Sequence, residues 1–279
     1  MTASLEVAAA AVDAWLKTAR RPLVVGLCGA QGSGKSTLAR KLCEHVEARG
    51  GRIAVLSIDD LYLSHVARQH LAETVHPLFA TRGVPGTHDV ALGVRLLDDL
   101  KAGRSVRLPR FDKGSDDPFP EDIWLVVNGP VDLVVLEGWC VGAVAQNEDS
   151  LAEPINALEM ENDPSGLWRR TANAALAGPY ADLFARIDRL ILLAAPDFAV
   201  VRDWRTQQEH GLRYRLRREN RSMARVMSDA EVARFIQFYE RLTRHILAEM
   251  PKRADLVLEL NRTRKLVHWL RPERESGAN

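Results

Sequence analysis

A glycine-rich stretch near the N-terminus has the spacing of a phosphate-binding loop. Residues 29–36 read G-x-x-x-x-G-K-S, between an apolar run and an amphipathic stretch. Glycine lets such a loop turn its N–H groups inward around phosphate, and the start of the following helix adds partial positive charge. Lys35 then reaches the β- and γ-phosphate oxygens, and the Ser36 hydroxyl coordinates Mg²⁺. The alternative is a glycine-rich turn that binds no ligand. The residues predicted to bind ATP here are Gly29, Ala30, Gln31, Gly32, Ser33, Gly34, Lys35, Ser36 and Thr37.

Two later apolar runs end in carboxylates. Residues 53–58 lead into Asp59 and Asp60, and residues 131–136 lead into Glu137. Ligands of an open parallel sheet gather outside the carboxyl ends of its strands, so these acids are expected on the rim of the glycine-rich loop. Asp59 is the candidate that orients or deprotonates an attacking hydroxyl, and Glu137 is the candidate carboxylate on the magnesium side. Alternatively, Asp60 caps a helix and Glu137 is a solvated strand-end residue.

Eight arginines occur within residues 202–225. Four of them recur at four-residue spacing along one helical stripe: Arg213, Arg217, Arg221 and Arg225. Negative charge on a transferred phosphoryl group calls for such cations, and a closing helix also excludes water. We therefore predict an arginine-rich lid at about residues 202–227, with a solvated charged surface as the alternative.

The elements that must position these residues alternate along the chain. Strands are expected at residues 23–28, 53–58, 131–136, 190–194 and 256–260. Helices are expected at residues 5–19, 35–48, 90–100 and 229–250, the last with a capping box from Ser228 to Glu231. Such alternation predicts an α/β parallel sheet. The irregular, proline-interrupted stretch at about 61–124 is expected to form a binding wall rather than core.

Composition limits the classes of partner. The chain of 279 residues has 38 basic and 37 acidic side chains, which gives no general attraction to nucleic acid or to a membrane surface. No segment approaches eighteen uninterrupted apolar residues, and the three separated cysteines suggest reduced core thiols. We expect one kinase domain over residues 1–272, followed by a frayed tail at 273–279. The expected location is cytoplasmic and the expected partner is a small molecule. The oligomeric state stays open.

These motifs together resemble a known family. Three segments are similar to P-loop small-molecule kinases related to uridine kinase, phosphoribulokinase and pantothenate kinase. They are residues 29–36, Ser57-Ile58-Asp59-Asp60-Leu61-Tyr62 and Leu136-Glu137-Gly138-Trp139. Four more segments resemble the D-glycerate 3-kinase family: residues 82–89, residues 109–113, Trp204-Arg205 and Gln208-Glu209. The resemblance covers most of the chain. It implies a P-loop NTPase three-layer fold, with a mostly parallel central sheet flanked by helices and an arginine-rich helical lid.

The resemblance also implies roles for single residues. Asp59 takes the position of the catalytic base, Glu137 that of the magnesium-side carboxylate, and the arginines around Arg205 and Arg213 form the lid. The residues expected to bind the acceptor are Asp60, Tyr62, Arg82, Thr87, His88, Asp89, Arg110, Asp112 and Lys113. Their cations suit the carboxylate of glycerate, although loop ion pairs and turns are the alternative reading. The sequence departs from the family at two places. Residues 259–263 lack the acidic residue that the family has after the last strand, and Arg225-Val226 stand where the family has a glycine.

Three functions are consistent with these features. The leading hypothesis is ATP-dependent phosphorylation of D-glycerate at its 3-hydroxyl, with Asp59, Lys35 and Arg213 as catalytic residues. A second keeps the same machinery for pantothenate, a nucleoside or a sugar phosphate. A third makes the chain a nucleotide-dependent switch without small-molecule turnover.

Overall fold

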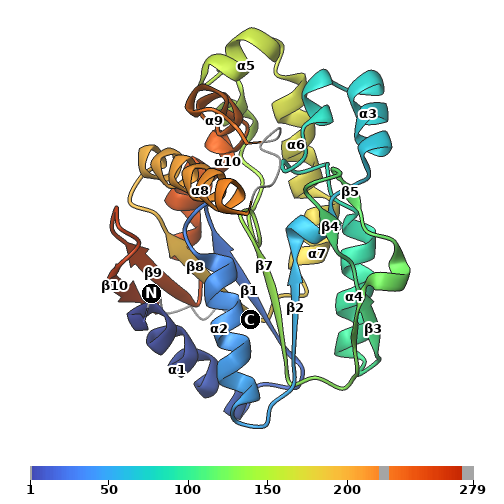
Figure 1. Cartoon of the computed structure of the whole chain (residues 1–279), viewed down its shortest axis with the longest axis vertical. Coiled ribbons are helices and arrows are strands. Elements are labelled where there is room, and N and C mark those ends of the chain that lie inside the picture. The colour runs from blue at the N-terminus through green and yellow to red at the C-terminus, as the bar shows by residue number, and fades with distance from the viewer. Residues whose placement is uncertain (1, 220–225, 272–279) are drawn as a thin grey trace.

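A six-stranded sheet forms the centre of the molecule, as a computed structural model describes it for residues 2–219 and 226–271 (Figure 1). The order of its strands is β10-β9-β8-β1-β7-β2. All neighbours pair in parallel except β10, which runs antiparallel to β9. The strands are β1 (Leu23–Gly29), β2 (Ile53–Ser57), β7 (Leu133–Gly138), β8 (Arg189–Ala194), β9 (Leu256–Leu260) and β10 (Leu266–Leu270). The predicted mostly parallel α/β sheet is confirmed, and β10 is a strand that the sequence analysis did not predict.

Helices cover both faces of this sheet. In Figure 1, α1 and α2 lie in front of the sheet, and α7 lies behind it and packs against α4. The helices are α1 (Thr2–Thr18), α2 (Lys35–Glu47), α3 (His65–Thr74), α4 (Val90–Lys101), α5 (Ala157–Asn162), α6 (Leu167–Ala177), α7 (Pro179–Phe184), α8 (Phe198–Arg218), α9 (Asp229–Phe235) and α10 (Gln237–Glu249). The predicted helix at 229–250 is thus two helices, with Ile236 between them, and the capping box at Ser228 is present.

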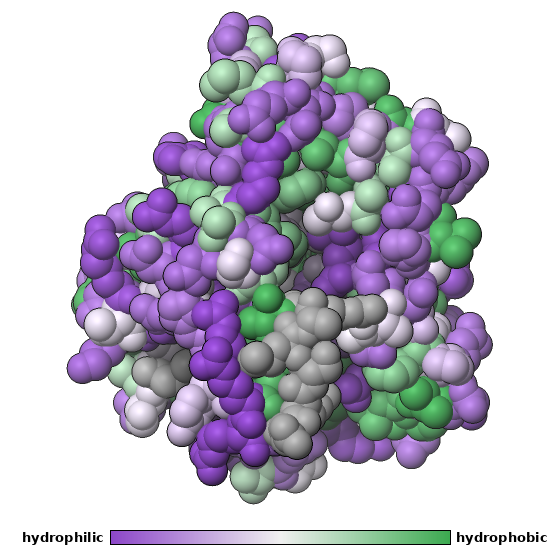
Figure 2. All heavy atoms as spheres, turned by 45° about the horizontal axis from the view of Figure 1, so that its top comes forward, coloured by the Kyte–Doolittle hydropathy of each residue, from purple (hydrophilic) through white to green (hydrophobic). Residues whose placement is uncertain are grey.

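The central strands are buried because helices cover both of their faces. Every residue of β1 is buried, which explains its unbroken apolar sequence. Cys28 at its end and Cys140 nearby are also buried, all three cysteines are free thiols, and burial raises the pKa of Cys28 to about 12. Hydrophilic residues cover most of the face seen in Figure 2, and hydrophobic residues show between them in smaller patches.

The stretch at 61–124 is an excursion from the sheet that contains α3 and α4, and with β6 directly after it the stretch forms two small antiparallel pairs. The pairs are β3 (Val106–Leu108) with β6 (Leu125–Val127), and β4 (Phe111–Asp112) with β5 (Asp117–Pro118). Arg221, Arg225 and the predicted tail at 273–279 lie outside the described residues. Within the ranges 2–219 and 226–271, none of the helices is both long and apolar enough to span a bilayer.

Candidate active site

The glycine-rich loop connects β1 to α2 at the carboxyl edge of the sheet. Gly34 is the N-cap of α2 with φ 95°, and no side chain caps this helix end. The N–H groups of its first turn are therefore available for an anion. Gly32 has φ 79°, and a Cβ atom there would lie 2.7 Å from the Cβ of Trp204 on α8. Both glycines are required by backbone geometry, and the loop is packed tightly beneath α8.

Ser36 and Glu137 meet beside this loop. The register of the sheet places Glu137 opposite Leu27 of β1 and Ser57 of β2, which brings it next to the start of α2. The Ser36 hydroxyl donates to Glu137 Oε1 at 2.9 Å. Glu137 is 5% exposed, and its Oε2 has no hydrogen-bond partner within the described ranges.

This pair fits a magnesium ion that also binds phosphate. Hydroxyl and carboxylate oxygens are the hard ligands that Mg²⁺ prefers, usually one or two from the protein with phosphates and water supplying the others. The part of the chain that the structure describes contains no cluster of three His, Cys, Asp or Glu side chains that could hold a metal by itself. Ser36 and Glu137 therefore suit an ion that arrives with a nucleotide.

Asp59 lies two residues after the end of β2, in the short 3₁₀ segment η1 (Ile58–Leu61). The Tyr62 hydroxyl donates to its Oδ1 at 2.8 Å, and the Lys113 ammonium group donates to its Oδ2 at 2.7 Å. Burial opposes ionisation of Asp59, but the positive charges of Lys113 and Lys35 and these two hydrogen bonds outweigh it. They hold the pKa of Asp59 well below its ordinary value. Asp59 is therefore a carboxylate at neutral pH.

One cavity of about 630 Å³ joins the glycine-rich loop to Asp59. The loop and β2 sides contribute Lys35, Ser36 and Asp59, and the excursion contributes Arg82 and Lys113. The helices above the sheet supply further lining residues, including Arg205, Gln208, Glu209, Arg215, Phe235 and Tyr239. The cavity thus combines a phosphate-binding loop, a carboxylate and several cations.

The excursion side of the cavity is held by an ion-pair cluster. Arg82 and the fully buried Arg68 both pair with Asp116, and both guanidinium groups lie within 5.7 Å of the centre of the Phe111 ring. A second hollow of about 620 Å³ adjoins the cavity and shares four lining residues with it: Arg82, Lys113, Arg205 and Phe235. The cluster fixes Arg82 while leaving 30% of its side chain exposed.

Three predicted acceptor-binding residues bond within the protein and do not line the cavity. The Thr87 hydroxyl donates to the Val84 carbonyl at 2.7 Å, and Asp89 caps α4. His88 is buried with its Nδ1 at 2.5 Å from the Tyr180 hydroxyl. Their side chains stabilise the wall behind the site.

Three further candidates also lie outside the cavity lining. Asp60 accepts from the Phe111 N–H at 3.0 Å, and burial raises the pKa of its carboxyl. Asp112 accepts from the Gly114 N–H at 2.7 Å, and Arg110 is exposed. Of the predicted acceptor-binding set, the cavity brings together Tyr62, Arg82 and Lys113.

Helix α8 supplies Arg205, which the sequence analysis singled out, and further cavity residues that had no predicted role. Arg213 donates to the Met227 carbonyl at 2.9 Å and does not line the cavity, whereas Arg215 does. Arg205 donates to Glu209 Oε1 at 2.8 Å and lies 5.6 Å from the centre of the Phe235 ring. Glu209 has no predicted role beyond its place in a motif. Phe235 lies on the helix predicted at 229–250 and packs against the core, so its apolar spacing gives no signal for its place at the site.

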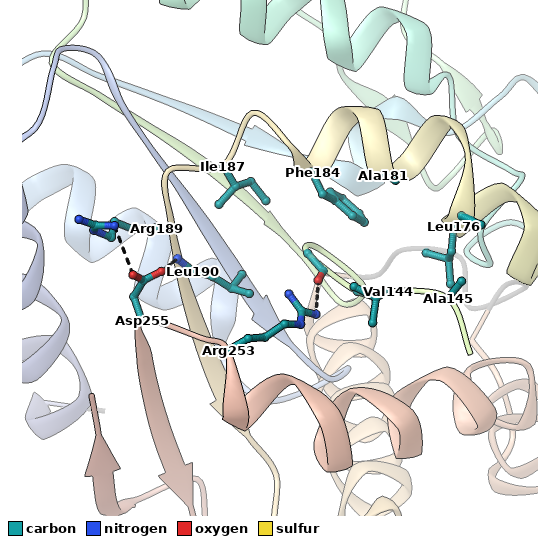
Figure 3. Close-up of a pocket in the computed structure, with 13 residues that line it drawn as sticks. Val144, Ala145, Leu176, Ala181, Phe184, Ile187, Arg189, Leu190, Arg253 and Asp255 are labelled. Atoms are coloured by element: carbon teal, nitrogen blue, oxygen red, sulfur yellow. Dashed lines mark hydrogen bonds and ion pairs between the residues drawn. The ribbon is translucent and has the colours of Figure 1, made fainter. Parts of the chain in front are cut away.

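A different cavity lies beside β8, α7 and the segment before β9 (Figure 3). It has a volume of about 420 Å³ and shares no lining residue with the site described above. Arg189 pairs with Asp255 at 3.4 Å, and Arg253 donates to the Gly142 carbonyl. Both arginines are thus engaged within the protein, and the rest of the lining is largely apolar: Ala143, Val144, Ala145, Leu176, Ala177, Ala181, Phe184, Ile187 and Leu190.

The strand order, the loop ending in Lys35-Ser36 and the acids after β2 and β7 define a P-loop kinase. The chain is 34% identical, over 78% of its length and 79% of the relative, to the "Uncharacterized kinase mug58" of Schizosaccharomyces pombe. It is 28% identical to the chloroplastic D-glycerate 3-kinase of Arabidopsis thaliana, over 84% of this chain and 50% of that protein.

A solved structure extends this likeness to almost the whole fold. The D-glycerate 3-kinase of Cryptococcus neoformans matches with a TM-score of 0.81 and 27% identity, over 96% of this chain and 99% of that one. A family model described as methylmalonyl Co-A mutase-associated GTPase MeaB matches residues 3–63 alone, which span the glycine-rich loop. The chain belongs to the glycerate 3-kinase family of P-loop kinases.

Proposed function

We propose that the protein transfers the γ-phosphoryl group of ATP to the 3-hydroxyl of D-glycerate, with Mg²⁺ as cofactor. The observation that carries the proposal is the cavity that Lys35 and Asp59 both line, with Arg82 and Lys113 in the same wall. The names of the Arabidopsis and Cryptococcus relatives support D-glycerate as the acceptor.

The nucleotide occupies the loop side of the cavity. Free N–H groups at the start of α2 and the Lys35 ammonium group bind the β- and γ-phosphates. Ser36 and Glu137 would hold Mg²⁺, which would neutralise charge on the phosphate oxygens. The buried Oε2 of Glu137, which lacks a partner among the described residues, is consistent with this role.

Asp59 holds the acceptor hydroxyl in line with the γ-phosphorus. The hydroxyl oxygen forms a bond to phosphorus while the bond from phosphorus to the β–γ bridging oxygen breaks. The hydroxyl proton passes to Asp59 and then to water, and ADP leaves. Tyr62 and Lys113 fix the carboxylate of Asp59 for this step.

Arg82 and Lys113 bind the carboxylate of the acceptor. Arginine has five donor hydrogens and lysine three, so their ion pairs with Asp116 and Asp59 leave further donors for an anion. Both side chains remain partly exposed in the cavity wall, at 30% for Arg82 and 59% for Lys113. A small hydroxy acid fits this arrangement.

The proposed lid at residues 202–227 includes residues 220–225, which lie outside the described ranges, and α8 supplies most of its described part. Arg205 and Arg215 line the cavity, so they are the arginines that we propose contact phosphate, in place of Arg213. A cytoplasmic location is also part of the proposal, and cell fractionation tests it.

A coupled assay of ADP release tests the proposed function. The acceptors are D-glycerate, L-glycerate, pantothenate, uridine and a sugar phosphate, each with Mg²⁺ and ATP. We expect D-glycerate to give the highest kcat/KM and 3-phosphoglycerate as product. If ADP is released with another acceptor of the panel but not with D-glycerate, that acceptor would replace D-glycerate in the proposal. Tight nucleotide binding without turnover of any acceptor would favour the nucleotide-dependent switch.

A further inference from the structure

Glu209 is a buried carboxylate in the wall of the active-site cavity, and one of its two oxygens has no hydrogen-bond partner among the described residues. It lies in the middle of α8, and its side chain is 3% exposed. Its Oε1 accepts from Arg205 at 2.8 Å, while its buried Oε2 has no hydrogen-bond partner within the described residues. A buried carboxylate oxygen without a partner is costly, so its position beside a cavity points to a ligand group that completes it.

The charges around the cavity indicate what that ligand group is. A carboxylate oxygen accepts hydrogen bonds and repels phosphate and carboxylate groups. The anionic parts of nucleotide and acceptor therefore belong with Lys35, Arg82 and Lys113, which line the same cavity. A neutral hydroxyl can donate to Glu209 Oε2 without that repulsion. Asp59 is the other acid of the wall, and the proposed function already gives it the attacking hydroxyl.

We propose that Glu209 accepts a hydrogen bond from a second hydroxyl of the acceptor, next to the one that is phosphorylated. The inference rests on the proposed function, in which this group is the 2-hydroxyl of D-glycerate. Asp59 then holds the 3-hydroxyl, and Arg82 with Lys113 holds the carboxylate. Glu209 makes the enzyme select dihydroxy acids over acids with a single hydroxyl.

The test compares two acceptors that differ by this one hydroxyl, D-glycerate and 3-hydroxypropanoate. Loss of a hydrogen bond to a charged, buried group predicts that wild-type kcat/KM falls about 10- to 100-fold with 3-hydroxypropanoate. In Glu209→Gln the amide oxygen keeps the bond to Arg205 and the NH₂ group replaces Oε2. We expect the ratio between the acceptors to shrink to below about tenfold there, and to about one in Glu209→Ala.

Gln208→Ala is the matched control, because Gln208 lines the same cavity from α8 but is exposed. It should keep the wild-type ratio between the two acceptors. The inference fails if the wild-type protein uses both acceptors equally. It also fails if Glu209→Gln lowers kcat/KM by the same factor for both, because that is the signature of a role confined to holding Arg205.

Failure of the proposed function gives a different result. The wild-type protein then releases no ADP with D-glycerate, and the comparison is made with the panel acceptor that does release ADP and its analogue without the neighbouring hydroxyl. A ratio that again depends on Glu209 would support the inference with a new acceptor. If no acceptor releases ADP, both proposals fail.

Discussion

Replacing Asp59 by asparagine separates phosphoryl transfer from nucleotide binding. The variant keeps the shape of the side chain and an oxygen that can accept from Tyr62, but it removes the negative charge that pairs with Lys113. A carboxylate that orients the attacking hydroxyl and accepts its proton as the new bond forms contributes about 10²- to 10⁴-fold to rate. We therefore expect kcat to fall by that factor. This corresponds to a loss of about 3 to 5 kcal/mol of transition-state stabilisation.

Binding of ATP should survive this substitution. Asp59 is close enough to Lys35 for the two charges to interact, so its removal takes a negative charge away from the phosphate site. The dissociation constant of a fluorescent ATP analogue should stay the same or decrease, while single-turnover phosphorylation of the acceptor slows. Asp132→Asn is the control, because Asp132 immediately precedes β7 at the opposite edge of the sheet and accepts from the Arg52 N–H at 2.8 Å. Turnover by Asp59→Asn within threefold of Asp132→Asn would refute the reasoning.

Three further predictions follow from the geometry. Glu137→Gln should raise the Mg²⁺ concentration for half-maximal activity at least about tenfold, measured by Mg²⁺ titration of ADP release; an unchanged titration would remove Glu137 from the metal site. Gly32→Ala forces a Cβ to within 2.7 Å of Trp204 at φ 79°, so urea unfolding should show a loss of about 1–3 kcal/mol together with weaker ATP binding; wild-type values for both would contradict the packing. Burial lowers the pKa of His88 from 6.5 to about 4, so over this window the unfolded chain binds a proton that the folded chain does not. As pH falls from 6.5 towards 4, this group should reduce the free energy of unfolding by about 1.4 kcal/mol per pH unit, and the slope should be smaller in His88→Gln.

The part of the site that sequence predicts well is the part fixed by local geometry. Glycines at 29, 32 and 34 with Lys35 specify a loop between a buried strand and a helix, and the structure has that loop between β1 and α2. The strand register then places Glu137 beside the loop, because parallel pairing of β7 with β1 aligns the carboxyl ends of both strands. A strand-end position in a parallel sheet is therefore a predictable position in space.

The walls contributed by helices and loops could not be predicted in the same way. Phe235 has the spacing of a core residue on an amphipathic helix, but α9 ends there and its ring faces Arg205 and the cavity. Asp89 and Thr87 are polar residues in a proline- and glycine-rich loop, and their side chains bond to nearby backbone. Hydrophobic periodicity separates buried from exposed faces, but it does not separate a core from a cavity wall.

The depressed pKa of Asp59 favours one of the two roles that its position allows. A strong general base would keep a pKa near neutral, whereas the charges of Lys113 and Lys35 hold Asp59 as a stable, weakly basic carboxylate. In a loose phosphoryl-transfer transition state the attacking hydroxyl carries little charge until late, so early deprotonation gains little. Asp59 then acts mainly by orienting the hydroxyl and accepts its proton only as the new bond to phosphorus forms. On this argument the chemical step should not depend on the ionisation of Asp59 between pH 5 and 8, and any acidic limb of the kcat profile in that range must come from another group.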